Sequence, residues 1–392
     1  MNYRKIVFLN THPIQYFAPM YQEMAAKKVF DFEVWYCTRH GLNAEVDKQF
    51  GKAVKWDIPI LEGYPHKFLK NHAPKPSLYS IWGIINPSIF KEIFRLPRKS
   101  AVVLFGWNNF TYLAAVMACK LSGQAVMIRC DTPFLREKLR RGFMSRFQRK
   151  LLQHLLFPLI DHFLYIGKQN KLFYQRYGVP ESKLANSPYA VDNERFHRQA
   201  TDLLKNKQSL KQELGFPPDK KVILFVGKLI PIKRPLDLIM AFKTIANDAN
   251  AVLAIVGDGE MKQEIEAKIA AYSLDDKVRL FGFVNQSKIA QFYAVSDVLV
   301  LCSSSEAWGL AVNEAMNFGL PVIVSDAVGC TDDLVKEGLN GFVVPTGDVE
   351  QLAEKLLYIL QNDEWRLKAR QVSHEVIAEY SYSVAIKNLA SL

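Results

Sequence analysis

Paired cysteines and long apolar runs are both missing from this chain of 392 residues. Its five cysteines are scattered and include no C-x-x-C pair, so neither a disulfide framework nor a common zinc site is indicated. The first apolar run, IVFL, is too short for a signal peptide, and no uncharged apolar stretch reaches about 18 residues. We therefore expect a cytoplasmic protein in a reducing compartment, without a segment that spans a membrane.

Acidic residues are scarce in the first half of the chain. Residues 1–180 hold 27 Lys and Arg against 11 Asp and Glu (net +16), whereas residues 181–392 hold 23 against 28 (net −5). This asymmetry predicts an anionic partner for the first half, either nucleic acid or an acidic membrane surface. Nucleic acid is disfavoured, because the chain has neither a recognition motif nor an array of aromatic residues for stacking bases.

The second half alternates short apolar runs with helical patterns. The runs are predicted to be buried strands, at 221–227, 251–257, 278–282, 297–302 and 321–325. The helical patterns lie at 235–246, 260–271, 286–295, 309–318 and 349–361. A β-α-β-α alternation of this kind predicts a parallel, doubly wound sheet.

The first half repeats this alternation less regularly, with predicted strands at 4–10, 32–37, 101–106, 125–130 and 162–167. We therefore predict an α/β protein with two Rossmann-like, doubly wound domains that face a deep interdomain cleft, where strand ends gather ligands. The expected parts are a first domain at 1–190, a linker at 191–218, a second domain at 219–375, and a terminal helix at about 376–392 that returns to the first domain.

Two lysines follow the first strand of the second domain. In KVILFVGKLIPIKRP the strand ends at Gly227, and Lys228 and Lys233 lie in a loop restricted by prolines. Their ammonium groups are suited to neutralising a diphosphate, although a lone K-x4-K pattern fits an ordinary exposed basic loop equally well. The GDGE motif at 257–260 lacks the full dinucleotide fingerprint, and a tight turn accounts for it.

The stretch SSSEAWGLAVNEAMNFGLPVIVSD, residues 303–326, is more specific. Glu306 lies in a serine-rich loop, and a helix is predicted to begin near Gly309, so that its first amides form an anion site. Those amides belong to Gly309, Leu310, Ala311 and Val312. Helical rise places Glu314 roughly 7 to 8 Å further along, within reach of a ribose. The alternative is a capping loop followed by a solvent-exposed helical Glu314.

This stretch, with GCTDDLV and NGFVV after it, resembles the E-x7-E region of retaining family-4 glycosyltransferases of GT-B fold. The elements VGKL…K, VGDGE and FGFVN…FYAVSD before it are similar to that family in order and spacing. The resemblance covers most of residues 220–360.

The resemblance implies a role for each matching position of a nucleotide-sugar donor site. Lys228 and Lys233 would hold the diphosphate, Glu314 the ribose and Glu306 the transferred sugar. The nucleotide base would lie against Phe283 and Val284, and backbone contacts to the donor would come from Gly227, Gly309, Leu310 and Ala311. Such enzymes need neither a metal nor another cofactor, which agrees with the absence of a D-x-D pattern from this chain.

The first half departs from the family at the acceptor side. THPIQYFAP, residues 11–19, replaces a Gly-Gly loop and resembles a subset of bacterial surface-polysaccharide transferases. We therefore expect His12 or Gln15 to contact the donor phosphate or the acceptor; a capped turn with a buried His12 is the alternative. In RCDTPF, Asp131 is the candidate for orienting the acceptor hydroxyl, with Arg129 pairing with it or with a phosphate. A structural ion pair between these two residues is the alternative.

Residues 136–159, REKLRRGFMSRFQRKLLQHLLFPL, interleave basic and apolar side chains. The pattern resembles a basic amphipathic helix that lies on anionic lipid, on the inner face of the cytoplasmic membrane. A packed helix with a solvated basic face is the alternative.

The resemblance implies a retaining, metal-independent hexosyltransferase that uses a nucleotide-diphosphate sugar. Its acceptor would be a hydroxyl of a glycan or lipid-linked glycan, in polysaccharide or lipopolysaccharide assembly. We expect front-face attack, with Glu306, Lys233, Asp131 and His12 at the reaction centre, because no second carboxylate is evident beside Glu306. Two alternatives remain, a GT-B-fold sugar-nucleotide epimerase or hydrolase and a non-catalytic partner subunit.

Overall fold

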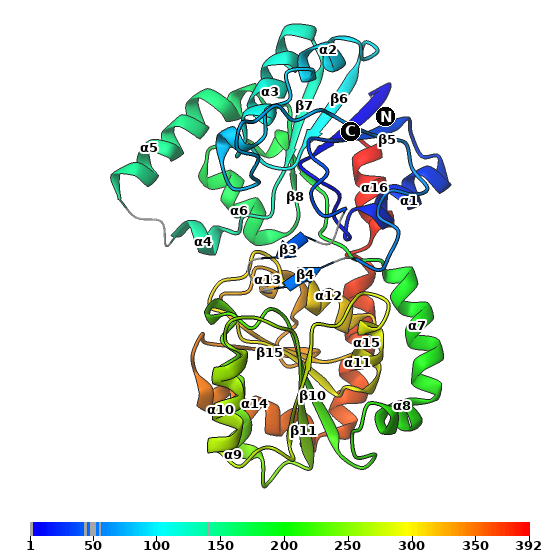
Figure 1. Ribbon diagram of the computed structural model, residues 1–392, viewed down its shortest axis with the longest axis vertical. Helices are drawn as coiled ribbons and strands as arrows, with labels where there is room; N and C mark the ends of the chain where they lie inside the picture. The colour runs from blue at the N-terminus through cyan, green and yellow to red at the C-terminus, as the bar shows by residue number, and fades with distance from the viewer. Residues whose placement is uncertain (1–2, 43–44, 48–51, 55, 139–141) are drawn as a thin grey trace. The chain divides into compact units, whose positions relative to one another are not determined.

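The chain folds into two compact units (Figure 1). The computed structural model describes residues 3–42, 45–47, 52–54, 56–138 and 142–392. The first unit comprises Met1–Glu45, Pro59–Tyr189 and Tyr382–Leu392. The second unit comprises Val46–Ile58 and Ala190–Ser381.

A six-stranded parallel sheet forms the centre of the second unit, in the order β12-β11-β10-β13-β14-β15. Its strands are β10 (Lys221–Val226), β11 (Ala251–Val256), β12 (Val278–Gly282), β13 (Val298–Leu301), β14 (Val322–Ser325) and β15 (Gly341–Val344). β11, β13 and β14 are buried along their whole length, as expected of parallel strands that helices cover on both faces.

Helices pack on both faces of this sheet (Figure 1). One face carries α9 (Pro235–Ile245), α10 (Lys262–Ala271) and α14 (Val349–Gln361). The other carries α11 (Ile289–Val295), α12 (Leu310–Met316) and α15 (Asp363–Ala378). The short elements η5 (Pro231–Lys233) and α13 (Thr331–Leu334) lie in loops that follow strands.

The first unit is built around a seven-stranded parallel sheet, in the order β5-β2-β1-β6-β7-β8-β9. Its strands are β1 (Lys5–Asn10), β2 (Phe32–Tyr36), β5 (His66–Phe68), β6 (Ser100–Leu104), β7 (Ala125–Arg129), β8 (His162–Tyr165) and β9 (Leu184–Asn186). A separate two-stranded sheet pairs β3 (Glu45–Asp47) with β4 (Lys52–Val54). The two doubly wound sheets confirm the predicted fold class.

The helices of the first unit include α1 (Ala18–Lys27), α2 (Ile89–Phe94), α3 (Phe110–Ser122), α4 (Phe134–Lys138), α5 (Phe143–Leu151) and α6 (Lys168–Arg176). α5 continues into a π-helical turn, η2 (Leu152–Leu156), and a 3-10 turn, η3 (Phe157–Leu159). The remaining 3-10 turns are η1 (Ile81–Gly83) and η4 (Glu181–Lys183).

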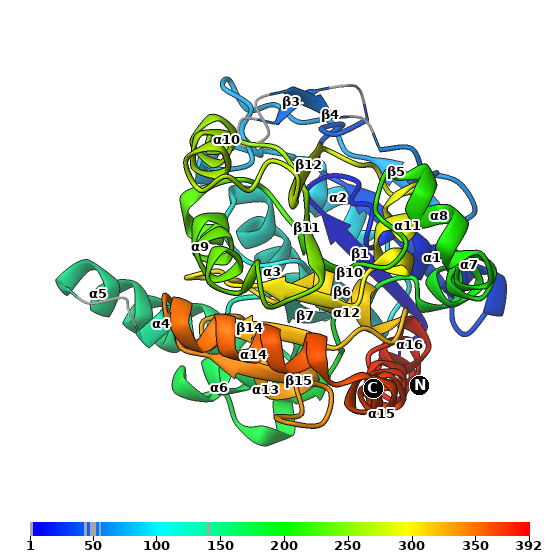
Figure 2. The same ribbon diagram turned by 90° about the horizontal axis from the view of Figure 1, so that it is seen from below.

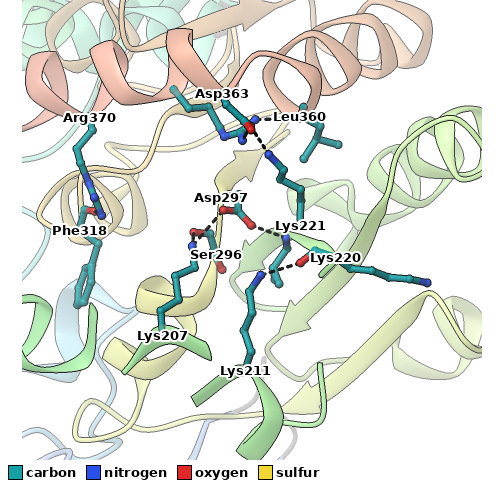
Figure 3. A network of polar contacts seen from close by, with 12 residues as sticks. Lys207, Lys211, Lys220, Lys221, Ser296, Asp297, Phe318, Leu360, Asp363 and Arg370 are labelled. Atoms are coloured by element: carbon teal, nitrogen blue, oxygen red, sulfur yellow. Dashed lines mark hydrogen bonds and ion pairs between the residues drawn. The ribbon is translucent and has the colours of Figure 1, made fainter. Parts of the chain in front are cut away.

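Residues 191–218 do not form the linker that the sequence predicted. They contain two helices of the second unit, α7 (Asn193–Lys205) and α8 (Lys207–Glu213), which lie beside α11 (Figure 2). The ammonium group of Lys207 contacts the Asp297 carboxylate at 3.0 Å, and that of Lys211 donates to the Lys220 carbonyl at 2.7 Å (Figure 3). The polar composition of the segment thus serves specific contacts with the sheet.

The chain returns to the first unit at its end. α15 closes the second unit, and α16 (Tyr382–Ala390) packs against α1 and β9 of the first unit. The Tyr382 hydroxyl donates to the Tyr16 carbonyl at 2.8 Å. The sequence placed the start of this returning helix at about 376. In the structure, α15 extends to Ala378, and the second unit ends at Ser381.

Candidate functional site

The lysine loop after β10 is held against the loop after β11. The Leu229 amide donates to the Asp258 carbonyl at 2.9 Å. A β-carbon on Gly257 would lie 1.8 Å from the Gly227 carbonyl oxygen, and one on Gly259 would lie 2.5 Å from that of Leu229. The GDGE glycines therefore permit close backbone contact between two loops, which is more than the simple turn that the sequence indicated.

Lys233 and Glu306 form an ion pair at the carboxyl ends of β10 and β13. The Ser304 amide donates to the Ile232 carbonyl at 2.8 Å, which joins the two loops that carry them. Both side chains are about four-fifths buried, with 19% and 17% exposed. Burial, followed by repulsion from Lys228, lowers the pKa of Lys233 to about 8. The ammonium remains mostly charged at neutral pH, and the Glu306 carboxylate favours that state.

The loop that carries Glu306 is fixed by the loop after β14. Glu306 and Val328 form an isolated parallel β-bridge, and the Glu306 carbonyl oxygen accepts a hydrogen bond from the Gly329 amide at 3.1 Å. A β-carbon on Gly329 would lie 2.0 Å from the Ala307 carbonyl oxygen. The glycine of the GCTDD motif thus allows the backbone approach that positions the Glu306 side chain. In the part of the chain that the structure describes, no group of three or more His, Cys, Asp or Glu residues is arranged to hold a metal ion.

Gly309 immediately precedes α12 and adopts a left-handed conformation, with φ of 105°. A β-carbon there would also lie 3.1 Å from the Val328 side chain. The Val312 amide donates to the Gly309 carbonyl at 2.9 Å, so it is engaged within the helix rather than with an anion. Of the four amides that the sequence proposed for anion binding, those of Gly309, Leu310 and Ala311 remain candidates.

Glu314 points into the protein from α12 and is only 2% exposed. The Tyr293 hydroxyl donates to its carboxylate at 2.6 Å. The Gln286 amide makes a longer contact of 3.5 Å with the other oxygen, and Arg195 holds Gln286 through a 2.8 Å hydrogen bond. The alternative of a solvent-exposed helical glutamate is therefore wrong. The carboxylate is oriented by its neighbours and retains further acceptor capacity.

Three further side chains of this stretch, Trp308, Asn313 and Asn317, make structural contacts. The Trp308 indole donates to the Asn313 side chain at 2.7 Å. The Asn317 amide donates to Asn193 at 3.0 Å, which ties α12 to the start of α7. These contacts fix the helix from which Glu314 projects.

The segment assigned to the nucleotide base follows β12. Phe283 and Val284 are half-buried. The Trp56 ring lies 6.3 Å from that of Phe283, and the Ser287 amide donates to the Asp57 carboxylate at 3.2 Å. A piece of chain from the first sequence half thus packs beside this segment within the second unit, which the sequence did not indicate.

In the first unit, His12 follows the end of β1 and is largely enclosed. Its Nδ1 lies 2.8 Å from the Thr11 hydroxyl, and its ring meets that of His40 edge-on at 5.3 Å. Burial, then repulsion from His40, lowers the pKa of His12 to about 4. His12 is therefore neutral at physiological pH and acts through hydrogen bonds rather than charge. Gln15, the other candidate in this loop, is buried.

Arg129 and Asp131 both line a pocket of about 220 Å³ at the carboxyl ends of β1, β6 and β7. No ion pair within 4 Å joins them among the described residues, so the alternative of a structural ion pair is wrong, whereas a contact between Arg129 and a phosphate stays a prediction. Instead, the Arg129 guanidinium lies over the rings of Phe17 and Tyr189, at 5.3 and 5.0 Å. Arg129 is buried, whereas Asp131 is exposed. Asp131 is thus the accessible carboxylate of this pocket, and Arg129 helps to build its wall.

The basic segment 136–159 forms the end of α4, then α5, η2 and η3, with residues 139–141 outside the described part. α5 buries none of its side chains. Its most exposed apolar residues are Phe143, Met144 and Phe147, at 83%, 63% and 55%. The alternative of a packed helix is therefore wrong for α5. None of the helices described is both long and apolar enough to cross a bilayer.

The comparisons with known proteins concern the second unit above all. Residues 206–375 match the family model described as glycosyl transferases group 1. The matched residues all lie within the second unit. The matched residues contain the lysine loop, Glu306 and Glu314, so the family assignment rests on the segment that forms the candidate site.

Similar proteins carry related names. The N-acetyl-alpha-D-glucosaminyl L-malate synthase of Bacillus anthracis is 28% identical over 43% of this chain and 44% of its own length. An alpha-1,4-N-acetyl-D-galactosaminyltransferase of Campylobacter jejuni, named for a glycan on PP-undecaprenol, is 28% identical over 71% of this chain and 72% of its own. The chain spans about half, or less, of the length of several other curated relatives that it matches.

A solved structure extends the similarity to both units. HepE from Anabaena, in complex with UDP, matches 99% of this chain and 98% of its own, with a TM-score of 0.75 and 17% sequence identity. At this identity the likeness establishes the fold alone. The predicted GT-B fold is confirmed.

Sequence reasoning missed the residues that support the candidate site. Tyr293 and Gln286, which hold Glu314, lie within an apolar helix and the loop before it, where they resemble ordinary core and turn residues. Trp56 and Asp57 are far from their partners in sequence, and no local pattern predicts such a contact. The available signal for Tyr293 was the sequence FYAVSD, in which Phe292 and Tyr293 lie within α11.

Proposed function

We propose that this chain is a retaining glycosyltransferase that moves a hexose-type sugar from a nucleoside-diphosphate sugar to a hydroxyl of a glycan or lipid-linked glycan. The observation that carries the proposal is the convergence of Lys228, Lys233 and Glu306 at one edge of the second sheet, inside the segment that matches the family. Two ammonium groups beside a carboxylate suit a ligand that joins a diphosphate to a sugar.

The donor is assigned to the second unit residue by residue. Lys228 and Lys233 neutralise the diphosphate, and on donor binding Lys233 exchanges its Glu306 contact for a phosphate oxygen. Glu306, released in this way, accepts hydrogen bonds from the transferred sugar. Glu314, oriented by Tyr293, accepts from the ribose hydroxyls.

The remaining donor contacts come from backbone and apolar groups. The base lies on Phe283 and Val284, and the amides of Gly309 to Ala311 supplement the lysines. Charge on the leaving diphosphate is stabilised by these cations and dipoles without a metal ion.

Transfer with retention follows front-face attack. The bond between the sugar's anomeric carbon and the phosphate oxygen breaks, and a bond from that carbon to the acceptor oxygen forms on the same face. The acceptor proton passes to the departing phosphate. The lysines stabilise the negative charge that develops on the leaving group more strongly than they stabilise the intact donor, which is the condition for catalysis.

The acceptor is assigned to the first unit. Asp131, exposed at the 220 Å³ pocket, accepts a hydrogen bond from the attacking hydroxyl, and neutral His12 provides a second polar contact. The Campylobacter relative, named for a glycan on PP-undecaprenol, supports an acceptor of the lipid-linked class. If the acceptor is a lipid-linked glycan, the protein acts at the inner face of the cytoplasmic membrane. Its reaction then belongs to surface polysaccharide or lipopolysaccharide assembly.

A panel of nucleoside-diphosphate sugars tests this proposal. Thermal stabilisation identifies the donor, and release of free nucleoside diphosphate is then measured with and without a panel of glycan acceptors. We expect acceptor-dependent release that persists in EDTA and is at least about 10²-fold slower in Lys233→Ala. Lys243→Ala, a surface change on α9, is the control and keeps the parent rate.

Three results would contradict the proposal. Product formation without an acceptor indicates an epimerase or hydrolase. Absence of any donor binding in calorimetry indicates a non-catalytic subunit. An unchanged rate in Lys233→Ala removes this lysine from the diphosphate site.

A further inference from the structure

A second and larger cavity lies in the first unit, beside the amphipathic helix. Its volume is about 860 Å³, within the range of roughly 300 to 1,000 Å³ typical of ligand sites. Its apolar lining comes from α3, α5, η2, α6 and the loops around them, and consists of Ile81, Trp107, Leu113, Leu151, Leu152, Leu155, Leu156, Phe173 and Tyr177. The cavity is open to solvent on one side, since Leu151 and Leu155 of its lining are 45% and 63% exposed. An accessible apolar cavity of this size is typical of a binding site for an apolar group.

The large cavity adjoins the small polar pocket that contains Asp131. Trp107, Asn108 and Thr132 line both. A single molecule can therefore extend from an apolar region under η2 to the exposed carboxylate at the end of β7. Among acceptors, this order of environments matches a lipid whose hydrocarbon chain carries a polar head with a reactive hydroxyl.

The charges around the large cavity favour an anionic group in that head. Arg136 lines the cavity and is exposed. The one acidic lining residue, Glu137, is buried and pairs with Arg149 at 2.7 Å, so its negative charge is compensated. Arg146 and Lys150 are exposed on α5 close by in sequence. When Arg149 is counted with the lining as the partner of Glu137, the positive charge of Arg136 remains beside the apolar walls, where it complements a phosphate.

We propose that this cavity binds the hydrocarbon chain of a phosphate-bearing lipid acceptor, with Arg136 at its phosphate. This inference rests on the proposed function, because it specifies the acceptor of the same reaction. It also assigns different roles to the two ends of this helical segment, because η2 and the end of α5 line the cavity and the start of α5 does not. Leu152 and Leu156 of η2 contact the chain inside the protein, whereas Phe143 and Phe147 of α5 face outward, where a membrane surface would meet them.

Dodecyl phosphate below its critical micelle concentration is the probe. Calorimetry with the full-length protein should show saturable binding, and inorganic phosphate at the same concentration should show none. Leu156→Trp fills the cavity from η2 and Leu113→Trp fills it from α3. Each should weaken binding by about tenfold, the effect of losing about two buried methylene groups. Phe143→Trp, on the outward surface and away from the lining, is the matched control and should bind as the parent does.

Arg136→Gln tests the phosphate contact separately. It should weaken dodecyl phosphate binding and leave nucleoside-diphosphate binding unchanged. If the parent does not bind dodecyl phosphate, or if both tryptophan variants bind it with parental affinity while remaining folded by circular dichroism, the inference is overturned.

The two proposals fail in different ways. Binding of dodecyl phosphate without any nucleotide binding supports the lipid cavity and contradicts the donor site. Nucleotide binding and sugar transfer to a soluble glycan, without any dodecyl phosphate binding, supports the proposed function and contradicts the lipid cavity.

Discussion

The Tyr293 hydroxyl and the Glu314 carboxylate meet at 2.6 Å inside the second unit. Tyr293 comes from α11 and Glu314 from α12, and both side chains are almost fully buried. The hydrogen bond thus fixes the position of a carboxylate that would otherwise be unfavourable in the protein interior.

Tyr293→Phe should therefore destabilise the protein. The substitution removes one hydroxyl and leaves a buried carboxylate oxygen without this donor, which costs about 1 to 3 kcal/mol of unfolding free energy. Urea denaturation measures the change. Tyr358→Phe, at a 43% exposed position on α14, should have almost no effect; equal stability of the two variants would show that the Tyr293 contact contributes little.

Donor binding should weaken as the pH rises from 7 to 9. The pKa of Lys233 is lowered to about 8, so its ammonium loses a proton within this range. The charged fraction falls about tenfold over those two units, and the affinity for a nucleoside diphosphate should fall in proportion. Lys233→Arg keeps its charge throughout and should remove most of this pH dependence. Calorimetric titration of both proteins with a nucleoside diphosphate at pH 7 and pH 9 measures these affinities. If the affinity of both proteins falls equally with pH, Lys233 is not the group that titrates at the diphosphate site.

Gly257→Ala should unfold the protein more readily than an ordinary glycine substitution does. The added β-carbon would lie 1.8 Å from the Gly227 carbonyl oxygen, so the lysine loop must move, at a cost of more than about 3 kcal/mol. Gly338→Ala is the control, because Gly338 also has a positive φ but has open space around it, and about 1 kcal/mol is expected there. Thermal unfolding compares the two, and a similar loss in both would mean that the loops separate without strain.

Anionic vesicles should retain the protein at low salt and release it as salt rises. The exposed cations of α5 each contribute about 1 kcal/mol near such a surface, and the attraction is screened by ions. Replacing Phe143 and Phe147 by Ser should reduce sedimentation with the vesicles, whereas Leu367→Ser, at a 68% exposed position on α15, should not. A protein that stays in the supernatant even at low salt would contradict membrane binding.

Sequence patterns predicted the central strands of both units to within one or two residues. The reason is physical, because runs such as AVLAIV at 251–256 are buried on both faces and consist almost wholly of apolar residues. β5, β9 and β15 were not predicted. β5 and β9 have only three residues of mixed polarity, β15 has only four residues, and all three strands lie at a sheet edge. α7 and α8 were predicted to be a linker because most of their residues are polar. Their buried apolar residues are Phe196, Ala200 and Leu210.

The candidate site followed from the sequence where the chemistry is local. Lys233 and Glu306 lie in loops that follow neighbouring strands, so the topology alone brings them together. Arg129 and Asp131 are two residues apart in sequence, and that spacing suggested an ion pair. Instead, the Arg129 guanidinium stacks on the aromatic rings of Phe17 and Tyr189. These residues are far apart in sequence, so no periodicity of the sequence could have indicated the contact.

The piece Val46–Ile58 has a practical consequence for anyone who exchanges halves between related enzymes. Trp56 and Asp57 are encoded early in the gene, yet they contact the segment after β12. A hybrid joined at residue 190 would therefore combine one parent's segment after β12, where we propose that the base binds, with the other parent's Trp56 and Asp57. Changes in nucleotide preference among such hybrids should be traced to these two positions before they are attributed to the C-terminal half.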